Sequence, residues 1–278
     1  MIIDSHCHLQ FKAYDNDREE VIQKCLEKGM LLNIVGTQND TSKEAVELAL
    51  KYDNFYATIG IHPIQHSKVE VKEEGDSFVS REEQFNESFF DELVQSGKVI
   101  GIGETGLDAF HIPDGKLGKE AFEKQKTLFL QHLHFAEKHN LPLVIHVRDA
   151  HTEMIELLKS VKQPIKGVLH CFTGNTEQAK AYLDLGLYIG LGGVVTFPPK
   201  KLDPEPQEEL FKAIDMIPLD KILTETDAPY LAPQAYRGER CEPWMTEEVV
   251  KFIAKRRKMG ESELEGVIEQ NFRKLFHV

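Results

Sequence analysis

Two histidines, His6 and His8, stand one residue apart in the segment IIDSHCHL, residues 2–9. Apolar residues lead into this segment, as in a buried strand, and successive side chains of a strand point to opposite faces. His6 and His8 would therefore share one face, about 6.6 Å apart along the strand axis, while Cys7 points the other way. Two such imidazoles can bind one metal ion, and a hydrogen-bonded histidine pair is the alternative interpretation.

Further potential metal ligands lie at the ends of other apolar segments. They are Glu104 in KVIGIGE, His146 in LPLVIHV, His170 in GVLHCF and Asp227 in KILTETD. Four imidazoles and two carboxylates are too many for one tetrahedral zinc ion but suit two divalent ions. Two ions about 3.5–4 Å apart can activate water and bind both the attacking and the leaving oxygen of a phosphoryl or acyl displacement.

These six residues can be assigned to two ions. His6, His8, Glu104 and Asp227 would bind the first ion, and Glu104, His146 and His170 the second. Glu104 would then bridge the ions, and Asp227 could orient the water and accept its proton, which makes both carboxylates candidate catalytic groups. Mg²⁺, Mn²⁺ and Zn²⁺ all suit such ligands. Hydrogen-bonded strand ends are the alternative for any single residue.

Eight apolar or β-branched segments can form the strands that position these ligands. They span residues 1–6, 31–37, 55–61, 98–104, 141–147, 167–172, 187–195 and 221–227. Segments of helical period separate most of them, such as REEVIQKCLEKG, which Gly29 can cap. This alternation predicts an α/β fold, a (β/α)₈ TIM barrel, with an open doubly wound sheet as the alternative. The C-terminal strand ends of a barrel converge, so the six ligands would meet there.

Two polar segments do not follow this pattern. Residues 66–88 are acidic, and residues 198–206, PPKKLDPEP, are rich in proline. We expect both to be solvated connections. Both follow a strand, so the alternative is that they border a substrate groove. Two helices around 246–258 and 262–276 would complete the outer ring.

Composition sets the class of protein. The 278 residues are 41% hydrophobic and contain no linker-like segment, which predicts a single domain over residues 1–278. No leader or long apolar run is present, so we expect a cytoplasmic protein that makes no membrane contact. We also expect a monomer. GLGG at 190–193 lacks the GxGxxG spacing, which argues against a nucleotide cofactor.

The net charge of −13 argues against a broad nucleic-acid-binding surface. A pocket with two divalent cations would still carry local positive charge where a phosphate could bind. A nuclease that binds only the end of a strand therefore remains compatible with the composition.

The motif series resembles that of the TatD-type metal-dependent hydrolases, a deoxyribonuclease-related branch of the amidohydrolase superfamily. The matching motifs are IIDSHCHL, TIGIHP, IGETGLD, LPLVIHVRDA, GVLHCFTG and LTETDAPYLAP. This resemblance implies a (β/α)₈ barrel, a two-metal centre with the ligand roles given above, and hydrolysis of phosphodiester bonds, often from the 3′ end of single-stranded DNA or RNA. The chain departs from the family at Ala109, where an aromatic residue is common, and at His132, where a glutamine is expected.

Four further residues could contact a substrate. His62 could hydrogen-bond a phosphate oxygen, Arg148 could bind a phosphate bidentately, Tyr230 could stack on a terminal base and Arg237 could bind the nucleic-acid backbone. A buried structural histidine, an ion pair of Arg148 with Asp108, a packed tyrosine and a solvated arginine are the respective alternatives. His111 and His134 are interpreted as surface residues without function.

The expected activity is that of a divalent-metal-dependent hydrolase, namely a 3′-to-5′ exodeoxyribonuclease acting on single-stranded DNA or RNA ends. An ester or amide hydrolase of the same superfamily, such as a D-aminoacyl-tRNA deacylase, is the alternative, because the same ligands can serve either reaction. A binding protein that has lost turnover is a third possibility.

Overall fold

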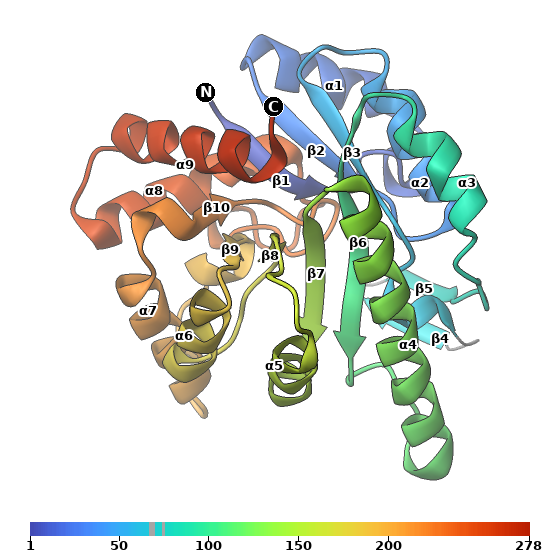
Figure 1. Ribbon diagram of the computed structural model, residues 1–278. Helices are drawn as coiled ribbons and strands as arrows, with labels where there is room; N and C mark the ends of the chain where they lie inside the picture. Colours follow the sequence, from blue (N-terminus) through green and yellow to red (C-terminus); the bar gives the residue numbers. More distant parts are fainter. Residues whose placement is uncertain (67–69, 74–75) are drawn as a thin grey trace. The chain divides into compact units, whose positions relative to one another are not determined.

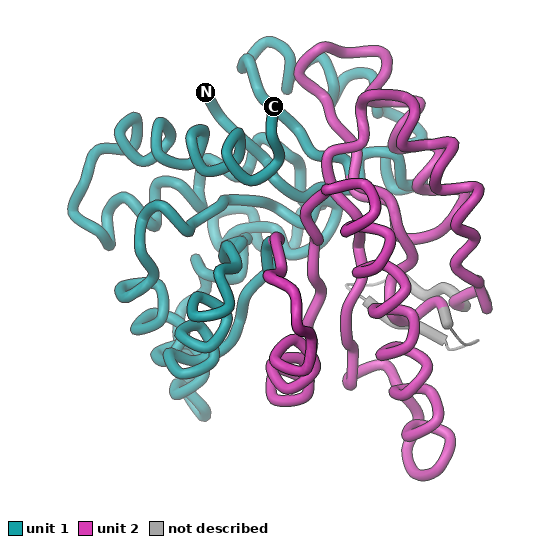
Figure 2. The backbone as a smooth tube through the Cα atoms, viewed as in Figure 1, with its two compact units in different colours: residues 1–34, 168–278 teal, residues 35–167 magenta. Residues whose placement is uncertain are grey.

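The computed structural model describes residues 1–66, 70–73 and 76–278, which form two compact units (Figures 1 and 2). The first unit comprises residues 1–34 and 168–278, and the second comprises residues 35–167. Both ends of the chain therefore belong to the first unit. The single-domain organisation stays a prediction.

The first unit is built on short, buried parallel strands. These are β1 (Ile3–Cys7), β2 (Leu31–Val35), β8 (Gly167–Leu169), β9 (Tyr188–Leu191) and β10 (Ile222–Thr224), except that the last residue of β2 and the first of β8 belong to the second unit. β1 pairs with β2, and β9 pairs with both β8 and β10. The segment after β10 runs beside the end of β1, because the Asp227 N–H donates to the His6 carbonyl at 2.9 Å and the His8 N–H to the Ala228 carbonyl at 2.7 Å. These bonds place Asp227 beside the two histidines.

Five α-helices of this unit cover its strands. They are α1 (Arg18–Glu27), α6 (Thr176–Asp184), α7 (Glu205–Met216), α8 (Thr246–Arg257) and α9 (Glu261–Phe276). α9 packs against β1 and β10, and α8 packs against α9. α6 begins with a capping box, in which Asn175 and Gln178 each accept the backbone N–H of the other at 2.9 Å. Gly29, with φ of 63°, follows α1 as the sequence predicts.

The second unit contains three parallel strands in the order β3 (Phe55–Ile59), β6 (Val99–Asp108) and β7 (Leu143–Arg148). Its helices are α2 (Asn39–Ala49), α3 (Glu87–Val94), α4 (Gly115–His139) and α5 (His151–Ser160). All ten residues of β6 are buried, as expected of a strand covered on both faces. Gly106 lies so close to β7 that a Cβ there would be 1.9 Å from the His146 carbonyl oxygen. Only glycine fits this approach.

The eight predicted strands are confirmed, but two details of the sequence prediction are wrong. Residues 193–196 form a 3₁₀ turn rather than the end of a strand. The acidic segment 66–88 is more than a loop, because β4 (Glu70–Glu73) and β5 (Asp76–Val79) form an antiparallel hairpin and α3 begins at Glu87. Val71, Phe78 and Val79 favour a strand despite the acidic neighbours. Residues 67–69 and 74–75 of this segment lie outside the described residues.

The proline-rich segment is exposed from Pro198 to Pro206, and α7 begins within it at Glu205. The part before α7 is a loop, as predicted. In the part of the chain that the structure describes, no helix combines the length and apolar character needed to cross a membrane.

Candidate metal centre

One group of potential ligands lies in the first unit, at the ends of β1 and β10. The Nε2 atoms of His6 and His8 are 3.3 Å apart. Asp227 Oδ1 is 3.3 Å from His8 Nε2 and 3.6 Å from His6 Nε2. The two imidazoles therefore do point to one side, as the strand alternation predicts, and three donor atoms converge on one point.

The backbone fixes this geometry. Asp227 has a φ of 64°, a left-handed conformation that aspartate tolerates better than most residues. Asp4, which is fully buried, accepts hydrogen bonds from the backbone and hydroxyl of Thr226 at 2.9 and 2.6 Å and from the His6 N–H at 3.2 Å. This carboxylate ties β1 to the segment that carries Asp227. The His8 ring also stacks on Phe11, with centroids 4.5 Å apart.

The charge of Asp227 is stabilised by the histidines around it. Burial alone would raise the pKa of Asp227, but the hydrogen bond to His8 and the positive charge that His170 and His6 can carry lower it below its ordinary value. A divalent cation would supply the same kind of positive charge at this position. The group therefore fits a metal ion both in donor type and in charge.

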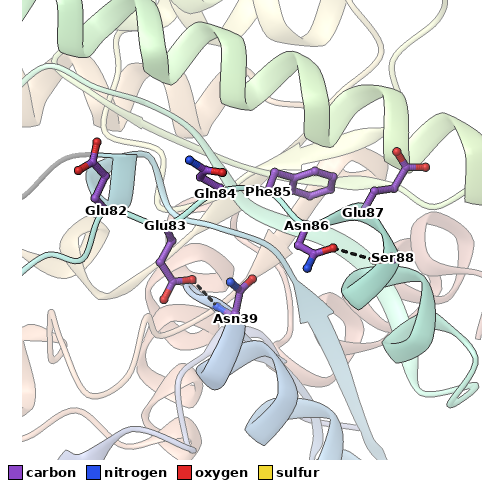
Figure 3. Close-up of a pocket in the computed structure, with 8 residues that line it drawn as sticks. All are labelled: Asn39, Glu82, Glu83, Gln84, Phe85, Asn86, Glu87 and Ser88. Atoms are coloured by element: carbon purple, nitrogen blue, oxygen red, sulfur yellow. Dashed lines mark hydrogen bonds between the residues drawn. The ribbon is translucent and has the colours of Figure 1, made fainter.

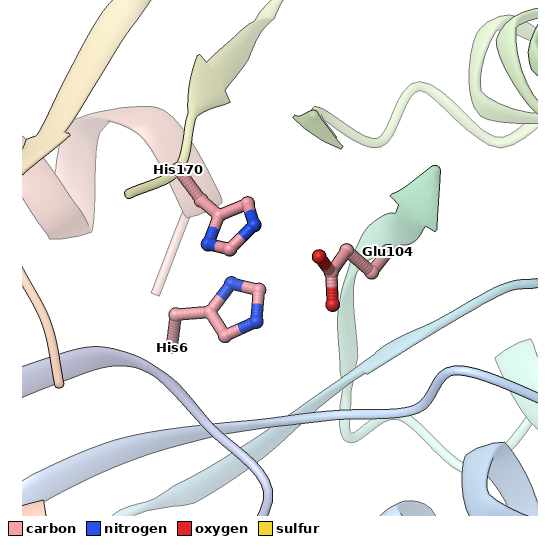
Figure 4. A group of neighbouring side chains, drawn as sticks. All are labelled: His6, Glu104 and His170. Carbon is pink, nitrogen blue, oxygen red and sulfur yellow. The ribbon is translucent and has the colours of Figure 1, made fainter. Parts of the chain in front are cut away.

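His170, from the end of β8, lies against this group. Its ring stacks on that of His6, with centroids 4.0 Å apart and planes 17° apart (Figure 4). The His170 Nδ1 atom is 3.4 Å from Glu225 Oε1, and the same carboxylate accepts the backbone N–H of Cys171. Gly190 makes room for Glu225, because a Cβ there would be 2.5 Å from Glu225 Oε2. Glu225 thus lies beside Nδ1 of His170, the position that a carboxylate commonly takes next to a metal-binding histidine.

A second group of potential ligands lies in the second unit. Glu104, on β6 (Figure 4), places its Oε1 atom 2.8 Å from His146 Nδ1 and 3.3 Å from His62 Nε2. The rings of His62 and His146 meet edge to face, with centroids 4.3 Å apart. Burial lowers the pKa of His62, against the opposing effect of Glu104. A neutral His62 can donate a nitrogen lone pair to a metal.

Two carboxylates surround His146. Burial alone would lower the pKa of His146, but hydrogen bonding to Asp108 and Glu104 outweighs burial and raises the pKa to about 9. Asp108 Oδ2 is 3.4 Å from His146 Nε2. His111 and His146 together hold the pKa of Asp108 well below its ordinary value, although burial acts in the opposite direction. This second group is thus arranged to stabilise a positive charge at His146, where a divalent cation would also be favoured.

Both groups meet the requirements of divalent-metal sites. Within each, one imidazole or carboxylate donor atom per residue lies within 4.8 Å of the others. The sequence-predicted ligands His6, His8, His170 and Asp227 lie together in the first unit, and Glu104 and His146 lie together in the second. His62, predicted as a substrate contact, lies beside Glu104 and His146 and is also a potential ligand.

The predicted substrate residues have varied surroundings. The Arg148 guanidinium lies 4.0 Å from the ring centroid of Phe110, and the Arg237 guanidinium lies 4.4 Å from that of Phe197. Tyr230 is partly exposed, and its N–H donates to the Asp227 carbonyl at 2.9 Å. These contacts leave the substrate roles of the three residues as predictions.

Sequence reasoning missed several partners of the ligands. Asp4, Asp108 and Glu225 are almost completely buried, and each contacts a predicted ligand or its backbone. A carboxylate two to four residues from a candidate ligand, within or just after an apolar strand, is the signal that could have found them. His111 is not a surface residue as predicted, because its side chain is 8% exposed and bound to Asp108.

A separate pocket of about 710 Å³ lies in the second unit, beside the starts of α2 and α3 (Figure 3). It is lined by Asn39 and residues 82–88. The Asn39 N–H donates to Glu83 Oε2 at 2.8 Å, which joins the two sides of the pocket. Its lining is polar and acidic apart from Phe85, and it contains none of the candidate ligands.

Comparison with known proteins identifies the family. The model of the family described as "TatD related DNase" matches residues 3–277. The chain belongs to the TatD family of metal-dependent hydrolases. This TatD-family chain is 34% identical to the metal-dependent hydrolase YabD of Bacillus subtilis, over all of both chains. It is 31% identical to the metal-dependent hydrolase YcfH of Escherichia coli, over 100% of this chain and 96% of YcfH.

A solved structure confirms the fold. The TatD homologue YjjV of Escherichia coli superimposes with a TM-score of 0.82 at 28% identity, over 100% of this chain and 98% of that chain. The fold of this TatD-family hydrolase is the (β/α)₈ barrel, as the sequence predicts. The resemblance stated on the motif series is likewise confirmed.

Proposed function

We propose that this TatD-family hydrolase is a divalent-metal-dependent nuclease that removes nucleotides from the 3′ end of single-stranded DNA or RNA. The match of residues 3–277 to a family described as "TatD related DNase" carries this proposal. The two groups of histidines and carboxylates support it, because they are donors suited to the ions that phosphodiester hydrolysis commonly uses.

The proposed ligands are those assigned from the sequence. His6, His8, Glu104 and Asp227 would hold one ion, and Glu104, His146 and His170 a second. The (β/α)₈ fold supports these assignments, because active sites of this fold are built at the C-terminal ends of its strands. His8 and His170 directly follow β1 and β8, whereas Glu104 lies within β6 rather than at its end, where the sequence had placed it. Bound there, the ions would supply Lewis acidity toward the phosphate and lower the pKa of water.

Asp227 is the proposed proton acceptor. Its carboxylate is ionised near neutral pH, as aspartates ordinarily are, so it can take a proton from an attacking water. Its Oδ1 atom faces His6 and His8, and the neighbouring Ala228 is fixed by the N–H of His8. Arg148 is proposed to bind a substrate phosphate, because it follows His146 by two residues and is only partly buried.

Digestion of end-labelled oligonucleotides tests this function. Metal-stripped protein would be incubated with 3′-labelled and 5′-labelled single-stranded DNA and RNA, with Mg²⁺, Mn²⁺ or Zn²⁺ added back separately. We expect metal-dependent release of mononucleotides from the 3′ end and no release by Glu104→Ala. Intact DNA and RNA with every metal would overturn the proposal, and mischarged transfer RNA would then be the next substrate to test for ester hydrolysis.

A further inference from the structure

A histidine that the proposed chemistry does not use lies in the loop after β6. His111 follows Asp108 by three residues and binds both oxygens of its carboxylate. The His111 Nδ1 atom is 2.7 Å from Asp108 Oδ2, and the His111 backbone N–H donates to Asp108 Oδ1 at 2.9 Å. The side chains of both residues are buried, at 8% and 0% exposure. Such a pair restricts the rotation of the carboxylate.

Hydrogen bonds also fix the backbone of Asp108. Its N–H donates to Gln125 Oε1 and its carbonyl accepts from Gln125 Nε2, each at 2.9 Å. Gln125 is fully buried on α4. Asp108 is therefore anchored to a helix through its backbone and to the loop through its side chain.

The anchored carboxylate faces a proposed metal ligand. Asp108 Oδ2, the atom that His111 Nδ1 contacts, is 3.4 Å from His146 Nε2. The other ring nitrogen of His146, Nδ1, is 2.8 Å from Glu104. The partner of one imidazole nitrogen sets the tautomer and the ring orientation with which the other nitrogen meets a metal. His111, Asp108 and His146 thus form a continuous chain of contacts that ends at the second ligand group.

We propose that His111 is a positioning residue, which fixes through Asp108 the orientation in which His146 presents Nδ1 toward Glu104 and a divalent ion. The inference rests on the proposed function in one respect, the role of His146 as a metal ligand. It concerns a residue of this chain's own loop, AFHIPDG, in the region where the sequence departs from the family pattern. The expected consequence is a change in metal affinity transmitted from a residue that does not itself bind the metal.

Two substitutions separate positioning from folding. His111→Ala removes the ring contact with Asp108 but keeps the backbone N–H that donates to Oδ1. His111→Asn restores a side-chain N–H donor close to the position of the imidazole Nδ1–H. His134→Ala is the matched control, because His134 is exposed on α4.

The first measurement uses metal-free protein, so it does not depend on the proposed metal role. Ring ¹⁵N and ¹H resonances of His146, assigned with a His146→Gln variant, report the surroundings of the two ring nitrogens. We expect them to shift in His111→Ala and to return toward the native positions in His111→Asn, while His134→Ala leaves them in place. His146 resonances that coincide in the native protein and His111→Ala would overturn the inference.

The second measurement is calorimetric titration with Mn²⁺ alone. We expect a weaker affinity in His111→Ala, up to the roughly 10- to 100-fold loss that follows removal of a direct partner of a metal ligand, and recovery in His111→Asn. Equal affinities of the native protein and His111→Ala would count against positioning. A native protein that binds no Mn²⁺, Mg²⁺ or Zn²⁺ would instead refute the proposed function, and the resonances of the metal-free protein would still decide the role of His111.

Discussion

At the scale of single residues, each candidate ligand group contains imidazoles and one carboxylate whose oxygen lies no more than 3.6 Å from their nitrogens. Asp227 lies beside the imidazoles of His6 and His8, and Glu104 lies beside those of His62 and His146. Isolated buried charges are costly, so these carboxylates and imidazoles depend on one another in the absence of a metal. Replacing each carboxylate by its amide, which has nearly the same shape but no charge, is therefore the clearest test of its role.

Replacing Glu104 by glutamine keeps the size of the side chain but removes the negative charge. If Glu104 bridges two ions, Glu104→Gln should lose bound metal and reduce hydrolysis by at least about 100-fold. Metal content measured by mass spectrometry and the rate on labelled DNA check this. Glu123→Gln, at an exposed position of α4, is the control. Full metal occupancy in Glu104→Gln would argue against the bridging role.

Asp227→Asn tests proton transfer separately from folding. Asparagine tolerates the left-handed φ of 64° at this position, so the fold should be retained, whereas Asp227→Ala should cost about 1 kcal/mol or more in strain. We expect Asp227→Asn to lower kcat roughly 100- to 10,000-fold. Hydrolysis rates and thermal unfolding of the two variants separate the effect on catalysis from the effect on stability. A native rate in Asp227→Asn would exclude Asp227 as the base.

At the scale of elements, α4 carries a histidine that supports the end of β3. His132 Nε2 accepts the backbone N–H of Ile61 at 2.9 Å, and its Nδ1 donates to the Leu128 carbonyl, 2.8 Å away. Its ring lies near Phe85 and Phe90. Burial lowers the pKa of His132 to about 4. The neutral ring thus provides the acceptor expected of a glutamine at this position, and Ile61 directly precedes the candidate ligand His62.

This environment predicts a pH dependence of stability. The folded protein resists protonation of His132 down to about pH 4, whereas the unfolded chain takes up the proton near its ordinary pKa of 6.5. The contribution of His132 to the free energy of unfolding is therefore complete above pH 6.5 and is lost as the pH falls toward 4. The loss is at most about 3 kcal/mol in the free energy of unfolding.

Urea unfolding between pH 7 and pH 4 checks this prediction. His132→Gln should be less sensitive to acid than the native protein over this range, because its amide keeps an acceptor without titrating. His134→Gln, two residues away and exposed, should follow the native curve. If the free energies of unfolding of the native protein and His132→Gln fall in parallel with pH, His132 is not the group that destabilises the protein in acid.

At the scale of the whole molecule, a metal ion that binds only the folded protein would stabilise it against unfolding. A ligand that binds only the folded state at 100 times its dissociation constant adds about 2.7 kcal/mol of stability. For a protein of this size we expect Tm to rise by roughly 5 °C with Mn²⁺ and to fall with a chelator. Calorimetric scans check this, and a Tm that does not change with any divalent metal would argue against metal binding to the folded protein.

The sequence by itself determined the repeating elements and the identity of most candidate ligands. Hydrophobic periodicity located the eight strands, because each strand is buried and each helix shows one apolar face. His6, His8, Glu104, His146, His170 and Asp227 could be singled out because each ends an apolar segment, and their motifs indicated the TatD family. These are local signals that do not depend on which segments become neighbours.

Only the tertiary structure decided which side chains meet. His62 from the end of β3 joins Glu104 on β6, and His111 turns inward to bind Asp108. Glu225 reaches His170 because Gly190 leaves room for it. Such pairings depend on the direction of side chains from different strands and loops, and sequence spacing does not encode that direction. The metal-binding residue types were thus readable along the chain, whereas the carboxylates that orient them became visible only in the folded protein.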